Sequence, residues 1–228
     1  MREKYLNRLE NDVRILKEAA LHKSIYQCEL ESKTGITYNT GSRCVHELED
    51  LGYLKIFGYE ETEAKGKKKK IWEITLKGLI NLLYIELDTG FWDGLEDIVH
   101  AHKDKLLIFR KWNFFQTKKL DKLIQIVLKN VLEYLAEQHL FLIQYGKKIS
   151  WTEEELQKLI DSMVLGAYAL RTQSLKCLQE QEHYSLIILK ACKKDPELHN
   201  YILNELHFFK KIAKSRLTSI LEGLEFMK

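Results

Sequence analysis

The stretch that decides the fold runs from Ile25 to Leu54 and reads IYQCELESKTGITYNTGSRCVHELEDLGYL. Two glycines, Gly35 and Gly52, each follow a segment with helical spacing of apolar residues. Because glycine adopts positive φ without steric cost, each is suited to end a helix in a Schellman-type turn. The stretch therefore predicts a short helix, a tight turn, a second helix and a sharp exit. The residues expected to point inward are Leu30, Ile36, Val45, Leu48 and Leu51.

Helical spacing also precedes this stretch, so residues 4–22 are predicted to form a first helix that packs across the next two. The second helix is expected at residues 29–34 and the third at residues 38–51, with Thr37 or Asn39 as the cap of the third. The third helix would carry short polar side chains outward on its first turns.

Two short β-rich segments follow, at residues 54–57 and 71–74. They are joined through residues 60–70, where Gly66 permits a turn. Five lysines load this connection with positive charge: Lys65, Lys67, Lys68, Lys69 and Lys70. The pattern predicts a two-stranded hairpin with a basic tip.

In this order the motifs resemble the winged helix-turn-helix domain of transcription regulators of the MarR/PadR type. The matching runs are Glu29-Leu30, Thr34-Gly35-Ile36-Thr37, Thr40-Gly41-Ser42-Arg43, Leu48-Glu49, Leu51-Gly52-Tyr53-Leu54 and Ile74-Thr75-Leu76-Lys77-Gly78. The resemblance covers about residues 5–87. It implies a DNA-binding domain at residues 1–87, built from three helices and a two-stranded wing.

The resemblance also implies which residues contact double-stranded DNA. A helix end in the major groove reads base edges with short polar side chains and arginine, here Tyr38, Asn39, Thr40, Ser42, Arg43 and His46. The wing lysines would hold phosphates, which supply affinity and orientation rather than sequence choice. The alternative is a solvated helix face and a solvated basic loop.

Residues 88–228 carry no resemblance and are predicted to form an all-helical domain of long antiparallel helices. The boundary is expected at residues 88–94, which hold two glycines. A helix of about 22 residues should start at Trp92, and another should run from Thr117 to Tyr145 with a heptad-like apolar seam. Its wide apolar face suggests a bundle or a subunit interface.

Start and stop signals mark the last helices. Gly146 should end the long helix, and Thr152 with Glu155 should form a capping box for the next. Asp195-Pro196 should start a further helix, with Pro196 at its first position.

The composition is that of a globular chain, 45% hydrophobic and 30% charged, with a single proline. The net charge is only +3, so any basic surface must be local. The four cysteines form no C-x-x-C pair, and Cys28 and Cys44 lie in amphipathic windows where buried thiols are expected. The chain shows no apolar signal region and no apolar run of about 18 residues. We therefore expect a soluble, cytoplasmic, reduced protein.

Enzyme chemistry has little support. No phosphate loop and no catalytic nucleophile setting is visible, so no catalytic residue and no cofactor is expected. His100 and His102 lie two apart on a predicted helix, and Glu180-x-x-His183 has no second copy, so no metal site is expected. An aromatic-rich segment could line an effector pocket, but core packing is favoured for Phe91, Trp92, Phe109, Trp112, Phe114 and Phe115.

The leading hypothesis is a sequence-specific DNA-binding regulator of transcription, acting as a homodimer through its C-terminal helices. Those helices could also receive a small-molecule or protein effector. The alternative is a protein-interaction scaffold in a nucleic-acid-processing complex, which the acidic run Glu47–Asp50 favours.

Overall fold

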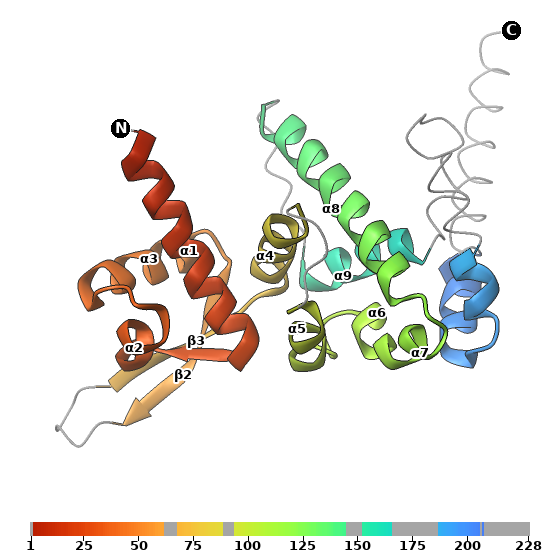
Figure 1. Ribbon diagram of the computed structural model, residues 1–228, viewed down its shortest axis with the longest axis horizontal. Coiled ribbons are helices and arrows are strands. Elements are labelled where there is room, and N and C mark those ends of the chain that lie inside the picture. The colour runs from red at the N-terminus through yellow and green to blue at the C-terminus, as the bar shows by residue number, and fades with distance from the viewer. Residues whose placement is uncertain are drawn as a thin grey trace, which may run out of the picture.

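The computed structural model describes residues 2–61, 68–88, 94–144, 152–165, 187–205 and 207. The chain is mainly helical, with a small three-stranded antiparallel sheet near its N-terminus (Figure 1). The N-terminal elements are α1 (Arg2–His22), β1 (Ser24–Tyr26), the 3-10 turn η1 (Gln27–Glu29), α2 (Leu30–Thr34), α3 (Tyr38–Asp50), β2 (Leu54–Glu61), β3 (Lys68–Ile74) and α4 (Leu76–Asp88). The predicted order of helices and hairpin in this part is confirmed.

The sheet contains one strand more than the sequence indicated. Its strand order is β1-β3-β2, so β3 lies in the middle and pairs with both neighbours in the antiparallel sense. Trp72 at the centre of β3 is opposite Ile25 on one side and Ile56 on the other. The register of β2 shifts between Ile56 and Gly58. A strand as short as β1 has too few residues to show a period of its own.

The two turn glycines behave as expected, with φ of 69° at Gly35 and 74° at Gly52. The N–H of Gly35 donates to the carbonyl of Glu31, closing α2. Two details of this region were wrong. Thr37 is the N-cap residue of α3, but its hydroxyl bonds the hydroxyl of Thr40 instead of a backbone N–H. Leu51 is 52% exposed, because it follows the last turn of α3 and leaves the buried face.

Helix α4 begins against the turn that follows α3. The hydroxyl of Thr75 accepts from the N–H of Gly78 and donates to the carbonyl of Gly52, at 3.0 and 2.7 Å. The threonine therefore caps α4 and also joins it to the turn. The approach is close, because a Cβ at Gly78 would lie 2.2 Å from the carbonyl oxygen of Tyr53.

The second half of the described chain is helical. It contains α5 (Leu95–Ala101), α6 (Leu107–Arg110), α7 (Trp112–Thr117), α8 (Asp121–Gln144) and α9 (Glu153–Val164). Residues 187–192 and 196–205 are also helical. The capping box of Thr152 and Glu155 is present, as predicted. Asp195 caps the helix that Pro196 begins, accepting from the N–H groups of Glu197 and Leu198.

The continuous helix predicted from Trp92 onward was wrong. The chain leaves α5 at His102 and becomes extended at Leu106 before α6. The buried ring of His102 donates from Nε2 to the carbonyl of Ala20 at 2.7 Å, at the far end of α1. The carboxylate of Asp161 on α9 then accepts from the N–H groups of Leu107 and Ile108. These distant partners make the break more favourable than a straight helix.

The long helix starts later than expected. Thr117 bonds back to the carbonyl of Asn113 and so closes α7, and Lys119 adopts φ of 57° before α8 begins at Asp121. The predicted apolar seam is buried where its side chains are described, at Ile124, Val127, Leu128, Val131 and Leu132. The predicted stop at Gly146 lies outside the described residues, as do Phe91, Trp92 and the continuation beyond residue 207.

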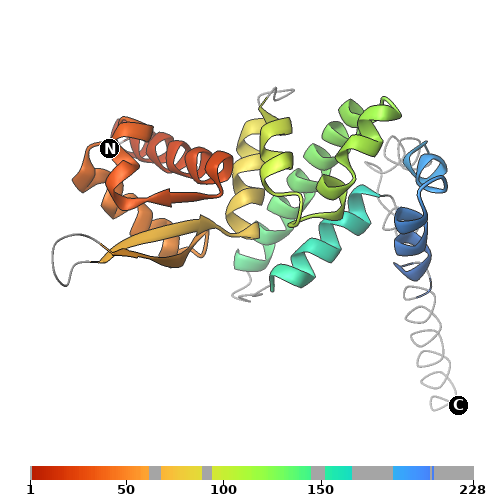
Figure 2. The same ribbon diagram turned by 90° about the horizontal axis from the view of Figure 1, so that it is seen from below.

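One continuous cluster of buried apolar residues runs through both halves. Helix α1 contacts α5, and α4 contacts both α8 and α9. Figures 1 and 2 both show α4 between the sheet-containing part and the helical part. The loop expected to separate two domains, residues 89–93, lies outside the described residues, so the division at residues 87 and 88 stays a prediction.

The cysteine and aromatic side chains differ in how deeply they are buried. Cys44 is buried as expected, whereas Cys28 is exposed, against the expectation of a buried thiol. Phe109, Trp112 and Phe115 are buried in the core, which confirms the packing interpretation for these three side chains. Within the described ranges, no helix combines the length and the apolarity that a membrane crossing requires.

Candidate nucleic-acid interface

Helix α3 has one buried and one exposed face. Gly41, Cys44, Val45 and Leu48 are buried on the core side, and a Cβ added at Gly41 would lie 3.5 Å from Leu30 of α2. The opposite face exposes Tyr38, Asn39, Arg43 and His46, while Thr40 and Ser42 are half-buried. Asn39, Arg43 and His46 follow one another at spacings of four and three, so they form one ridge along the helix. All six predicted contact residues of the helix are therefore at least partly accessible.

The first turn of α3 is held in place by polar contacts. Gln27 Nε2 donates to the hydroxyl of Tyr38 at 2.8 Å, and this ties the start of α3 to the 3-10 turn before α2. The hydroxyls of Thr37 and Thr40 are bonded to each other at 3.1 Å. Tyr38 nevertheless stays 47% exposed. Its ring can contact a ligand without breaking the bond to Gln27.

The strand register separates the wing lysines. Lys65 and Lys67 lie outside the described residues, as does the side chain of Lys68. Successive residues of a strand point to opposite faces. Lys70 therefore shares a face with the buried Trp72, whereas Lys69 points to the other face of the sheet. Tyr59 is opposite Lys70 in the register and is 55% exposed.

A single carboxylate oxygen connects α3 with β3. Glu49 Oε2 accepts from Trp72 Nε1 at 3.1 Å and lies 3.3 Å from His46 Nδ1 and 3.8 Å from Lys70 Nζ. The ring of His46 meets the indole of Trp72 edge to face, with centroids 5.8 Å apart. The Lys70 ammonium lies 5.9 Å from the center of that indole. The exposed ridge of α3 and the face of β3 that carries Lys70 and Trp72 thus meet on one surface.

The charge on Glu49 is stabilised by these partners. Partial burial raises the pKa of Glu49, but the hydrogen bonds from Trp72 and His46 and the charge of Lys70 outweigh it, so the pKa lies below its usual value. An ionised carboxylate can only accept hydrogen bonds. His46 must therefore carry its proton on Nδ1, the nitrogen that faces Glu49.

Glu49 and Trp72 were missed by the sequence analysis as parts of this surface. The sequence does indicate that Glu49 is a neighbour of His46, because residues three apart lie side by side on a helix. It gives no such indication for Trp72, since Trp72 lies 23 residues from Glu49. The acidic side chains of Glu47 and Asp50 are also on α3, so the helix itself is not basic.

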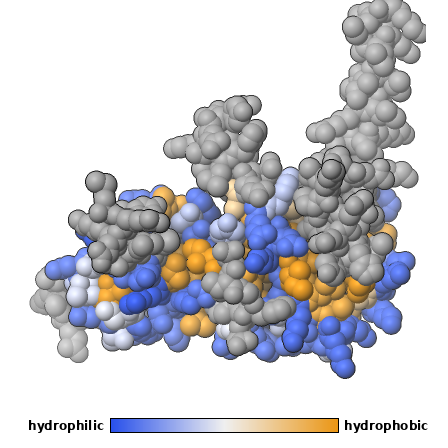
Figure 3. All heavy atoms as spheres, turned by 45° about the horizontal axis from the view of Figure 1, so that its top comes forward, coloured by the Kyte–Doolittle hydropathy of each residue, from blue (hydrophilic) through white to orange (hydrophobic). Residues whose placement is uncertain are grey.

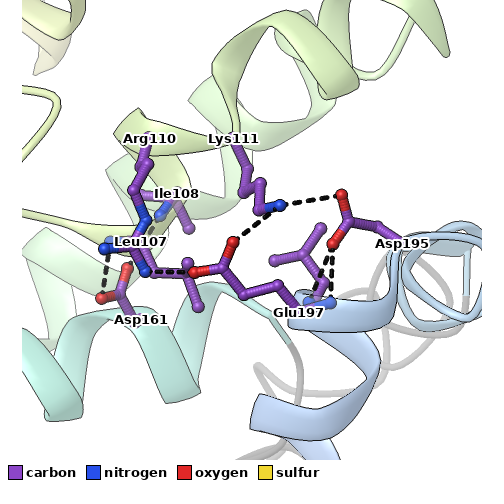
Figure 4. Close-up of polar contacts among 8 residues, drawn as sticks. Leu107, Ile108, Arg110, Lys111, Asp161, Asp195 and Glu197 are labelled. Carbon is purple, nitrogen blue, oxygen red and sulfur yellow. Dashed lines mark hydrogen bonds and ion pairs between the residues drawn. The ribbon is translucent and has the colours of Figure 1, made fainter.

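A second polar cluster lies in the helical half and joins three of its segments (Figure 4). Asp161 on α9 caps α6 through the N–H groups of Leu107 and Ile108, at 2.9 and 3.1 Å. Lys111 bridges Asp195 and Glu197 at 2.9 and 2.8 Å. Arg110 also pairs with Glu197. Each charged group here has a partner within the fold, so the cluster reads as a structural joint.

Burial and pairing act differently on the acids of this joint. Burial raises the pKa of Asp161 to about 7, although the two backbone N–H groups oppose the change. Partial burial also raises the pKa of Asp195, but the N–H of Leu198 and the charge of Lys111 outweigh it and hold the pKa below its usual value. The hydrogen bond from Lys111 likewise lowers the pKa of Glu197.

Metal ligation finds no support where side chains are described. In those ranges no three histidine, cysteine or acidic side chains gather as a metal site would require. His102 is a buried histidine satisfied by a backbone carbonyl, and His100 is an exposed neighbour of Glu96. Glu180 and His183 lie outside the described residues.

The most exposed large apolar side chains of the described residues lie on β2 and on or beside α3, at Phe57, Tyr59, Leu51 and Tyr38. On the face shown in Figure 3, hydrophobic residues gather over the middle of the molecule, around α4, and over the helical half. Comparison of the chain with models of protein families, with curated proteins and with solved structures gives no match. The surface formed by α3 and β3 is therefore the candidate functional site of this chain.

Proposed function

We propose that residues 1–87 form a winged helix-turn-helix domain that binds double-stranded DNA. The order α1, β1, α2, α3, β2, β3 with strand order β1-β3-β2 supports this assignment, since it offers a helix next to a two-stranded wing. Helix α3 would enter the major groove with Tyr38, Asn39, Thr40, Ser42, Arg43 and His46. The lysines at positions 65 and 67–70 would lie along phosphates.

The observation that carries this proposal is the contact of His46 and Lys70 with the same oxygen of Glu49. A base-reading helix is useful only if the phosphate contacts hold it in register. Because Lys70 lies beside the exposed ridge of α3, one DNA duplex can touch both. A regulator of transcription acting as a homodimer would follow, with two such domains on half-sites about one DNA turn apart.

The adjacent lysines Lys69 and Lys70 offer a matched test. Lys70→Ala should weaken binding to all duplexes alike. It should also reduce the slope of log K against log salt concentration by about one, because one phosphate contact is lost. Lys69→Ala should have a smaller effect, because Lys69 points away from α3. The measurement is a gel-shift titration at several salt concentrations. Equal effects of the two variants would contradict the assigned geometry of the wing.

Base reading is tested separately at Arg43. Arg43→Ala should relax sequence discrimination by about 1–3 kcal/mol at one base pair, while binding to random duplex changes less. If sequence preference stays intact in Arg43→Ala and the lysine variants bind as wild type, this mechanism is wrong. Light scattering tests the proposed homodimer, whose mass should be twice the 27.0 kDa of one chain.

An interaction scaffold is the second candidate, and the acidic half of α3 favours it. Glu47, Glu49 and Asp50 follow the ridge, and Glu49 neutralises part of the charge of Lys70. Such a surface would suit a protein partner better than a phosphate backbone. Absence of binding to random duplex at micromolar protein and low salt would favour this alternative.

A further inference from the structure

The ring of His46 is held from two sides although its side chain is 46% exposed. Nδ1 faces the carboxylate of Glu49 at 3.3 Å, and the ring meets Trp72 edge to face. Glu49 on the same helix is the charged group that faces the ring, and Lys70 on β3 lies 3.8 Å from the same carboxylate oxygen. Among the described residues, Nε2 makes no hydrogen bond. This nitrogen is therefore the one that the surface offers to a ligand.

Whether Nε2 donates or accepts a hydrogen bond depends on whether Nδ1 carries the proton of the neutral ring. When the imidazole is neutral and Nδ1 carries the proton, Nε2 can only accept a hydrogen bond. In the major groove the donors are the exocyclic amino groups of adenine and cytosine, whereas guanine and thymine present acceptors at the corresponding edges. A doubly protonated ring donates from Nε2 instead, and its preferred partners are then guanine, thymine or a phosphate.

We propose that Glu49 is a specificity-determining positioning residue, which fixes the tautomer of His46 so that Nε2 accepts from the amino group of adenine or cytosine. The inference rests on the proposed function, since it requires α3 to lie in the major groove. It goes further in assigning a base class to one side chain.

The test is selection from a library of duplexes with a randomised central segment, followed by sequencing of the bound fraction. Wild type at about pH 8 should enrich adenine or cytosine at one position by about tenfold, the scale of a single mismatched base pair.

Glu49→Gln is the informative variant. The glutamine amide can accept from Trp72 and from a protonated Nδ1, and by rotating it can also donate to an unprotonated Nδ1. Both tautomers of His46 then become available. Enrichment at the one position should fall to near even, while preferences at the other positions remain. His46→Ala should lose the same preference.

Glu96→Gln is the matched control, because Glu96 pairs with the exposed His100 at 3.6 Å on α5, away from α3. It should select the same sequences as wild type. Near-UV circular dichroism checks that Glu49→Gln is folded. If Glu49→Gln lowers affinity for every sequence alike and keeps the preference at that position, Glu49 is only structural. If wild type binds no duplex at low salt, both the proposed function and this inference fail.

Discussion

Asp161 and Asp195 perform the same local task in different surroundings. Each carboxylate caps a helix by accepting from two backbone N–H groups. Asp161 is 1% exposed and forms no ion pair among the described residues, whereas Asp195 is bonded to Lys111. Burial therefore dominates at Asp161 and raises its pKa to about 7, while at Asp195 the partners outweigh burial and lower the pKa.

These opposite shifts predict opposite dependences of stability on pH. Between about pH 4 and about pH 7 the folded chain keeps the proton of Asp161 and the unfolded chain releases it, so this group's contribution to the unfolding free energy falls as pH rises. Asp161→Asn removes that slope. The stability of Asp161→Asn relative to wild type should therefore improve between about pH 5 and about pH 8, as urea unfolding at a series of pH values will measure.

Asp195→Asn is the internal control for this prediction. The lowered pKa of Asp195 stabilises the fold above the ordinary pKa of aspartate, and this contribution is lost as pH falls through the lowered value. Asp195→Asn should therefore cost more stability at about pH 7 than at about pH 3. A cost of Asp161→Asn that grows with pH in the same way would show that its two backbone N–H bonds outweigh burial.

At the scale of elements, the close approach of α4 to the turn after α3 can be tested at a glycine. Gly78 lies in the first turn of α4, where helix propensity alone predicts that alanine stabilises by about 1 kcal/mol. A Cβ there would instead meet the carbonyl oxygen of Tyr53 at 2.2 Å. The backbone carbonyl of Tyr53 cannot rotate aside as a side chain can. Gly78→Ala should therefore lower the unfolding free energy by about 1–3 kcal/mol or more.

Gly58 is the control for this substitution. It lies on β2 with nothing within 4 Å of its Cβ position and without a positive φ. Gly58→Ala should therefore change the unfolding free energy by no more than about 0.5 kcal/mol. Thermal unfolding followed by far-UV circular dichroism compares the two variants. A stabilised Gly78→Ala would mean that α4 does not dock on Tyr53 as described.

At the scale of the whole molecule, several contacts join the two halves. Lys105 lies 3.5 Å from Glu73 of β3 and 3.9 Å from Glu153 of α9. Glu153 also accepts from the N–H of Leu76 at the start of α4. The bond from His102 to Ala20 connects the loop after α5 to α1. With one continuous apolar cluster beneath them, these contacts fix β3 on the helical half.

Unfolding should therefore be a single cooperative transition. Intrinsic tryptophan fluorescence and far-UV circular dichroism should give coincident urea curves, because neither half buries its apolar surface alone. Two separated transitions would show instead that residues 1–87 fold as an independent domain. His102→Ala offers a further check, since it should shift the whole transition to lower urea and leave it single.

Local signals predicted much of the fold. Gly35 and Gly52 end their helices, Thr75 caps α4, and the capping box at Thr152 is present, because each of these interactions is satisfied within a few residues along the chain. The ridge of α3 was predictable for the same reason, as helical spacing alone brings Asn39, Arg43 and His46 together.

The sequence by itself thus determined where most helices lie and which face of α3 is polar, since those properties depend on neighbours in the chain. Only the tertiary structure decided the break after His102. That break depends on the hydrogen bond from the N–H of Leu107 to Asp161, which lies 54 residues further along the chain. The tertiary structure also decided the pairing of β1 with β3 and the meeting of His46, Trp72 and Lys70 at Glu49. The physical reason is that a buried hydrogen bond to a distant partner can outweigh a local preference of the backbone.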